Sequence, residues 1–178
     1  MLQEKINTTE LFASFYDCTS LFVRLAASLT EKQINTVPFK ESWTAGQLLE
    51  HVTRSNRGIA KALYIKGNPA ERAPWKRAQE LKEMFLDFTI KFKSPDFILP
   101  TKDHYYKEDI IEDLENSVEL LKAVSRNVNL AEAIKHAAFG EITKLELLYF
   151  VQFHMQRHLE QLKNISTAVV QCKQNTLR

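Results

Sequence analysis

Residues 145–165, LELLYFVQFHMQRHLEQLKNI, decide the fold that this chain is expected to adopt. Apolar residues recur in this stretch every three or four positions, which is the period of an amphipathic α-helix. Thr143 and Glu146 stand at the spacing of a capping box, so we expect the helix to begin there and to continue to about Gln171. Its buried side is expected to consist of Leu147, Val151, His154, His158, Leu162, Ile165 and Val169.

The same period predicts three further long helices and one short helix. The long ones are expected from about Thr9 to Leu29, from Thr44 to about Leu63 and from about Lys107 to Asn127, and the short one lies between Glu80 and Phe92. Asn7 is the expected cap of the first long helix and Asp103 that of the third, because short polar side chains accept from backbone N–H groups there. Thr44 and Gln47 form a second capping box.

Four amphipathic helices without a clear strand pattern indicate an all-α protein, a four-helix bundle. The chain has 4 glycines in 178 residues, which argues against a sheet-rich fold with many tight turns. The long connection from about Gly67 to Tyr106 permits a crossover between the second and third long helices. At this length, residues 1–178 are expected to form a single domain with one core.

Charge and cysteine content exclude several classes of protein. The formal net charge is +2, and Lys and Arg are interleaved with Glu and Asp, so we expect no nucleic-acid partner. Cys18 and Cys172 form no CxxC pattern, which indicates neither a disulfide framework nor a thiolate metal cluster. Without an export signal or an apolar run of 18 residues, the expectation is a cytoplasmic protein that does not bind membranes.

Two histidines raise the question of a metal site. His154 and His158 are four residues apart on the apolar side of the last helix, so both rings can reach one ion. His51, at the edge of the buried side of the second long helix, is the best third ligand, whereas His104 and His136 lie in connecting segments. The alternative is that these are buried histidines paired with backbone or carboxylate groups.

Two stretches resemble the DinB-like (DinB/YfiT) superfamily, and the resemblance covers most of the chain. They are ESWTAGQLLEHV, residues 41–52, and FGEITKLELLYFVQFHMQRHLEQLKNI, residues 139–165. The matching positions are Trp43, Phe139-Gly140, Thr143 with Glu146, and His154-Arg157-His158. The resemblance implies a four-helix bundle whose metal triad is His51, His154 and His158, with water completing the coordination.

The resemblance also implies a divalent transition metal, zinc or nickel first and iron or manganese as alternatives. Relatives include thiol-dependent S-transferases and metal-dependent hydrolases, so we expect a small-molecule substrate, a cofactor thiol among the candidates, and a homodimer. No further catalytic residue stands out, and Met155 occupies the position of the glutamate in an HExxH metalloprotease. The alternative function is a non-catalytic helical bundle that serves as a binding or dimerisation module.

Other polar and aromatic residues have simpler interpretations. Arg157 is expected to orient a substrate anion or to pair with Glu160 or Glu141 at the surface. Gln161, one turn from His158, is a candidate to fix the orientation of that ring. The aromatic residues of the stretch 85–92 are expected to fill the space beside the crossover.

Overall fold

The computed structural model describes residues 8–175, and it describes their side chains as far as residue 171. The four long helices within this range are α1 (Thr9–Ser28), α3 (Ala45–Leu63), α5 (Lys107–Ser125) and α6 (Lys144–Asn175). The short ones are α2 (Glu31–Ile34), α4 (Ala78–Leu86) and the 3₁₀ turn η1 (Asp96–Ile98). The expected four-helix bundle is confirmed, and its helices begin and end within a few residues of the expected positions. Asn7 lies outside the described residues.

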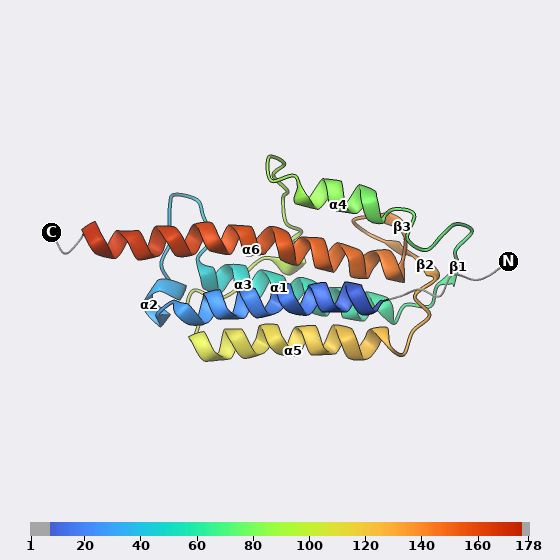
Figure 1. Ribbon diagram of the computed structural model, residues 1–178, viewed down its shortest axis with the longest axis horizontal. Coiled ribbons are helices and arrows are strands. Elements are labelled where there is room, and N and C mark those ends of the chain that lie inside the picture. The colour runs from blue at the N-terminus through green and yellow to red at the C-terminus, as the bar shows by residue number, and fades with distance from the viewer. Residues whose placement is uncertain (1–7, 176–178) are drawn as a thin grey trace.

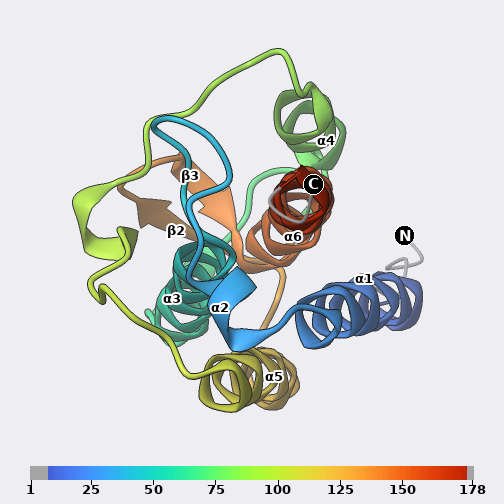
Figure 2. The same cartoon turned by 90° about the vertical axis from the view of Figure 1, so that its left-hand side faces the viewer.

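The connection between α3 and α5 makes these two helices run in the same direction, whereas α1 and α6 run in the opposite one (Figure 1). Seen end-on, α1 lies diagonally opposite α3 in the bundle, and α4 packs outside α6 (Figure 2). The crossover is therefore confirmed. It brings the first half of α3 beside the middle of α6, where the histidines are located.

Capping boxes start three helices. Thr44 with Gln47 starts α3, as expected, and Thr143 with Glu146 starts α6 through bonds of 3.0 and 3.1 Å. Thr30 forms another with Gln33 at the start of α2.

The expected cap of α5 is wrong, because that helix begins after Tyr106 rather than near Asp103. The backbone N–H of Lys107 donates instead to Glu31 of α2 at 3.4 Å. A side chain distant in the sequence thus satisfies a helix start that usually needs a local cap.

A small antiparallel sheet at one end of the bundle corrects the expectation that the chain has no strands. Its strands are β1 (Asn68–Pro69), β2 (Glu132–His136) and β3 (Gly140–Thr143), in the order β1-β2-β3. Gly140, the first residue of β3, has a φ of 64°, a conformation that glycine adopts at little cost. The sheet places Thr143 where it caps α6.

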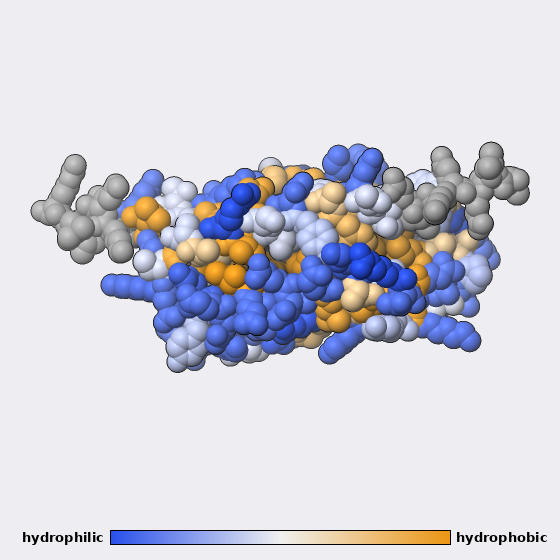
Figure 3. Space-filling model, turned by 60° about the horizontal axis from the view of Figure 1, so that its bottom comes forward, coloured by the Kyte–Doolittle hydropathy of each residue, from blue (hydrophilic) through white to orange (hydrophobic). Residues whose placement is uncertain are grey.

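The core confirms the expected apolar side of α6. Every residue expected on the buried side of α6, from Leu147 to Val169, is buried, the two histidines included. Hydrophilic residues cover much of the face shown in Figure 3, although apolar areas reach the surface there. Of the aromatic residues beside the crossover, Phe85 is buried, but Phe88 and Phe92 are exposed and fill the predicted space only in part. None of the helices in the described part of the chain combines the length and the apolar character that crossing a bilayer requires.

Candidate metal centre

Three histidines from two helices meet inside the bundle. His51 comes from the second turn of α3, and His154 and His158 come from consecutive turns in the middle of α6. All three are buried, and their candidate ligand atoms lie within 4.8 Å of one another. The structure therefore brings together the residues that sequence reasoning had selected.

The Nε2 atoms of the three rings face one another. His154 Nε2 lies 3.3 Å from His51 Nε2 and 3.0 Å from His158 Nε2. His51 Nδ1 donates to the carbonyl oxygen of Ile98 at 3.0 Å, and His158 Nδ1 donates to Gln161 Oε1 at 2.9 Å. Because a neutral imidazole carries one proton, the Nε2 atoms of His51 and His158 both present lone pairs.

This arrangement leaves the three rings without enough protons to satisfy their contacts. A proton on His154 Nε2 can be donated to only one of its two neighbours, so the lone pair of the other ring is left without a donor. Without that proton, both contacts join groups that only accept. A cation satisfies all three lone pairs at once. Two imidazole nitrogens that bind one zinc ion at 2.0–2.1 Å lie about 2.9–3.4 Å apart for bond angles between 90° and tetrahedral. The observed 3.0 and 3.3 Å fit that range.

The environment keeps the three imidazoles neutral, the form that binds metal. Burial lowers the pKa of His51, although the bond to Ile98 opposes this effect. Burial also lowers the pKa of His154 far below its usual value, and repulsion from the other two rings adds to it. For His158, burial and repulsion from His51 lower the pKa to about 3. All three are therefore neutral imidazoles at neutral pH, each able to offer one nitrogen lone pair to a metal.

Aromatic side chains surround the triad. The ring of Trp43 lies 4.9 Å from that of His51, and the rings of Phe150 and Phe85 lie 5.2 and 6.3 Å from that of His154, measured between centroids. His154 Nδ1 is buried and has no hydrogen-bond partner among the described residues. An ion at this place would be in a largely water-excluded site, where electrostatic interactions are strong.

The remaining expectations about polar side chains have mixed outcomes. His104 and His136 stay outside the cluster, and the contact of Gln161 with His158 is confirmed. The expected pairing of Arg157 is wrong. Its guanidinium donates to the backbone carbonyls of Phe85, Asp87 and Ile90, and it lies over the rings of Phe88 and Phe92.

Sequence reasoning missed two charged residues beside His51. Glu50 is buried and accepts from Tyr105 and Thr101, while Arg54 donates to the carbonyl of Phe97. Burial raises the pKa of Glu50, but these hydrogen bonds outweigh that effect and lower it to about 2. Two charged residues at i, i+4 on the buried side of a helix were the sequence signal that could have identified them.

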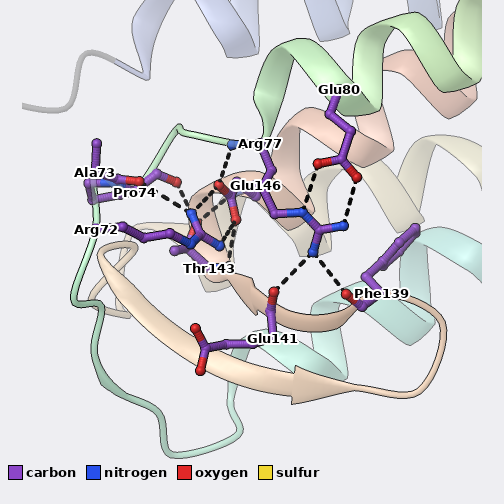
Figure 4. A network of polar contacts seen from close by, with 9 residues as sticks. All are labelled: Arg72, Ala73, Pro74, Arg77, Glu80, Phe139, Glu141, Thr143 and Glu146. Atoms are coloured by element: carbon purple, nitrogen blue, oxygen red, sulfur yellow. Dashed lines mark hydrogen bonds and ion pairs between the residues drawn. The ribbon is translucent and has the colours of Figure 1, made fainter.

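A buried ion pair fixes the start of α6. Glu146 is fully buried and accepts two bonds from Arg72 as well as the backbone N–H groups of Arg77 and Thr143 (Figure 4). The guanidinium of Arg77 binds the carbonyls of Phe139 and Glu141 in the β2–β3 hairpin. These contacts join the segment before α4 to the helix that carries two of the histidines.

Fold and site together define a helical bundle with a buried cluster of three histidines. The family model of the DinB superfamily matches residues 14–162, and the chain belongs to that superfamily. It is similar to the uncharacterized protein YuaE of Bacillus subtilis (strain 168), with 25% identity over 145 residues, 79% of this chain and 88% of that protein. The crystal structure of TT2238, a four-helix bundle protein, matches with a TM-score of 0.57 and 15% identity over 86% of this chain and 96% of that one.

Proposed function

We propose that this chain binds one divalent transition-metal ion through the Nε2 atoms of His51, His154 and His158. The observation that carries the proposal is the pair of Nε2 contacts at 3.0 and 3.3 Å, which three neutral imidazoles cannot satisfy by sharing protons. Zinc and nickel suit three imidazole ligands best, and iron and manganese are the alternatives. Membership in the DinB superfamily supports a metal at this place.

We further propose that the site acts on a small molecule, as a hydrolase or as a thiol S-transferase. Three protein ligands would leave a bound divalent ion one free position, where the pKa of a water or thiol would be lowered to give a nucleophile near neutral pH. The protein's own contribution is to hold the rings and exclude water. Ile98 and Gln161 fix the rings of His51 and His158, and Trp43 packs beside the ring of His51.

Elemental analysis tests the metal proposal. Protein purified without an affinity tag is expected to contain close to one transition-metal ion per chain, and His154→Ala is expected to lose it. His104→Ala is the matched control, because His104 is exposed and lies outside the cluster. Equal metal content in wild type and His154→Ala would contradict the proposal. Screening the loaded protein for thiol transfer and for ester and amide hydrolysis then separates the two reactions.

A second candidate is a binding or dimerisation module without turnover. Three apolar side chains, Leu21 on α1, Leu120 on α5 and Val170 on α6, are exposed and available for an interface. Apolar areas on the face of Figure 3 favour the same interpretation. A homodimer in sedimentation, combined with bound metal but no turnover in the screens, would support this candidate. The proposed setting for both candidates is a reduced cytoplasm, which the absence of a disulfide framework in the cysteine pattern supports.

A further inference from the structure

The segment 97–105, which begins within η1, is attached to α3 next to the metal centre. The carbonyl of Ile98 accepts from His51 Nδ1 at 3.0 Å. One residue earlier, the carbonyl of Phe97 accepts from Arg54 Nη2 at 2.9 Å and from Arg54 Nε at 3.3 Å. The carbonyl that orients His51 is therefore adjacent to the one that Arg54 holds, and both belong to the same short stretch of backbone.

Glu50 holds the next part of the same segment. Its Oε2 accepts from the backbone N–H of Thr101 at 2.9 Å and from the hydroxyl of Tyr105 at 2.5 Å. Its Oε1 accepts from Thr101 Oγ1 at 2.7 Å and from Arg54 Nη1 at 3.4 Å. A buried carboxylate is costly unless it is hydrogen-bonded, and three of these four bonds come from residues 101–105.

The far end of the segment is fixed as well. Backbone groups of Tyr105 exchange two hydrogen bonds with the side chain of Asn35, at 2.8 and 2.9 Å. The ring of Tyr105 packs on Gly46 of α3 so closely that a Cβ there would lie 2.5 Å from it. The segment 97–105 is thus attached to α3 at several points around His51, and its backbone has little freedom to move away from that ring.

We propose that Glu50 and Arg54 are positioning residues for the metal ligand His51, which they hold through the segment 97–105. They fix the carbonyl of Ile98, and this carbonyl in turn keeps the proton on His51 Nδ1 and the lone pair of Nε2 directed at the triad. Neither residue binds the ion. This inference rests on the metal-binding function proposed above.

The chemistry of metal-bound histidine explains why such residues matter. A hydrogen bond to the nitrogen that does not bind metal fixes the tautomer and the ring orientation, and loss of such a partner lowers metal affinity about 10- to 100-fold. His158 has its partner on its own helix, in Gln161. His51 depends on backbone 47 residues away in sequence, so it needs other contacts to keep that backbone in place.

Zinc affinity measured by competition with a chromophoric chelator tests the inference. Arg54→Gln and Glu50→Gln are expected to raise the dissociation constant about 10- to 100-fold. Thr101→Val, which removes one bond to Glu50, is expected to raise it less. The matched control is Arg57→Gln on the same helix, because Arg57 pairs with Asp113 of α5 and not with the segment. Its dissociation constant is expected to stay within about threefold of wild type.

A second measurement needs no metal and does not depend on affinity. In ¹⁵N NMR spectra of the metal-free protein, His51 is expected to show a proton on Nδ1 in wild type and in Arg57→Gln. A mixture of tautomers is expected in Arg54→Gln, which a general loss of stability does not produce.

The outcomes separate the two proposals. If wild type binds zinc while Arg54→Gln and Glu50→Gln bind it equally well and keep the tautomer of His51, the positioning role is wrong and the metal site stands. If wild type binds no transition metal, the proposed function fails and this inference fails with it.

Discussion

Replacing Glu146 by glutamine tests how the crossover is attached to the start of α6. Glu146 Oε1 accepts from Arg72 at 2.5 Å and from the backbone N–H of Arg77 at 2.8 Å. Glu146 Oε2 accepts from Arg72 at 2.7 Å and from the backbone N–H of Thr143 at 3.0 Å. Each oxygen thus has two donors. An amide puts an NH₂ group at one of these places, where it faces donors only, and it also removes the charge that Arg72 neutralises.

The expected cost is large because the group is buried. Removal of one partner from a buried ion pair costs about 3–5 kcal/mol. For a chain of this size, each kcal/mol shifts the melting temperature by about 2–4 °C, so Glu146→Gln is expected to melt roughly 6–20 °C below wild type. Glu80→Gln in the same cluster is the control. Glu80 pairs with Arg77, but its side chain is 51% exposed, and such pairs contribute less than about 1 kcal/mol.

Urea unfolding followed by circular dichroism measures both free energies. The pH dependence gives an independent check. Burial raises the pKa of Glu146, but the bonds from Arg72, Thr143 and Arg77 outweigh it and hold this pKa below its usual range. Such a carboxylate stabilises the fold at pH values above its unfolded pKa of about 4.3, and that contribution is lost as the pH falls through the folded pKa. The difference between wild type and Glu146→Gln should therefore shrink in acid. A loss no larger than that of Glu80→Gln would refute the reasoning.

Three further predictions concern residues around the site. Arg157→Gln removes donors to the carbonyls of Phe85, Asp87 and Ile90, and it is expected to lower the free energy of unfolding in urea by about 1.5–3 kcal/mol. The control Lys163→Gln, at an exposed residue, is expected to lower it by less than about 1 kcal/mol. Equal effects would show that the contacts of Arg157 do not stabilise the fold. Met155→Ala is expected to lower the free energy of unfolding by about 2–5 kcal/mol, because Met155 lies fully buried between His154 and His158 in the sequence of α6. A loss below about 1 kcal/mol would contradict its place in the core. Zinc at a hundred times its dissociation constant is expected to stabilise wild type by about 2.7 kcal/mol in calorimetry. The stability of His154→Ala is expected not to change when zinc is added. Equal stabilisation of both proteins would contradict the proposed site.

The helices were predictable because their signals are local. The apolar repeat of each helix and the two capping boxes can be recognised within a few residues of sequence. The structure confirms both boxes, Thr44 with Gln47 and Thr143 with Glu146. The cap of α5 was not predictable in this way, since Glu31 lies 76 residues from the N–H group that it accepts from.

The sheet escaped prediction for a different reason. Strands β2 and β3 have 5 and 4 residues, and exposed Lys135 and Glu141 face each other across them. So short a pattern, with one buried residue in β2, has no clear alternation of apolar and polar residues.

The histidine cluster could be selected from sequence, but the contacts that orient it could not. The four-residue spacing of His154 and His158 selected these two residues, and the position of His51 at the edge of the buried side of α3 selected the third. The partner of His51 is a backbone carbonyl, at Ile98, which any residue type supplies. Arg157 looked like a surface residue beside Glu160, whereas its real partners are carbonyls 67–72 residues away.

Anomalous diffraction at the absorption edge of the bound metal tests the central claim most directly. Crystals of protein purified without a tag are expected to show one strong anomalous peak between α3 and α6, about 2.0–2.2 Å from the Nε2 atoms of His51, His154 and His158. A metal peak elsewhere on the chain, or one bonded through Nδ1 of any of these rings, would contradict the account.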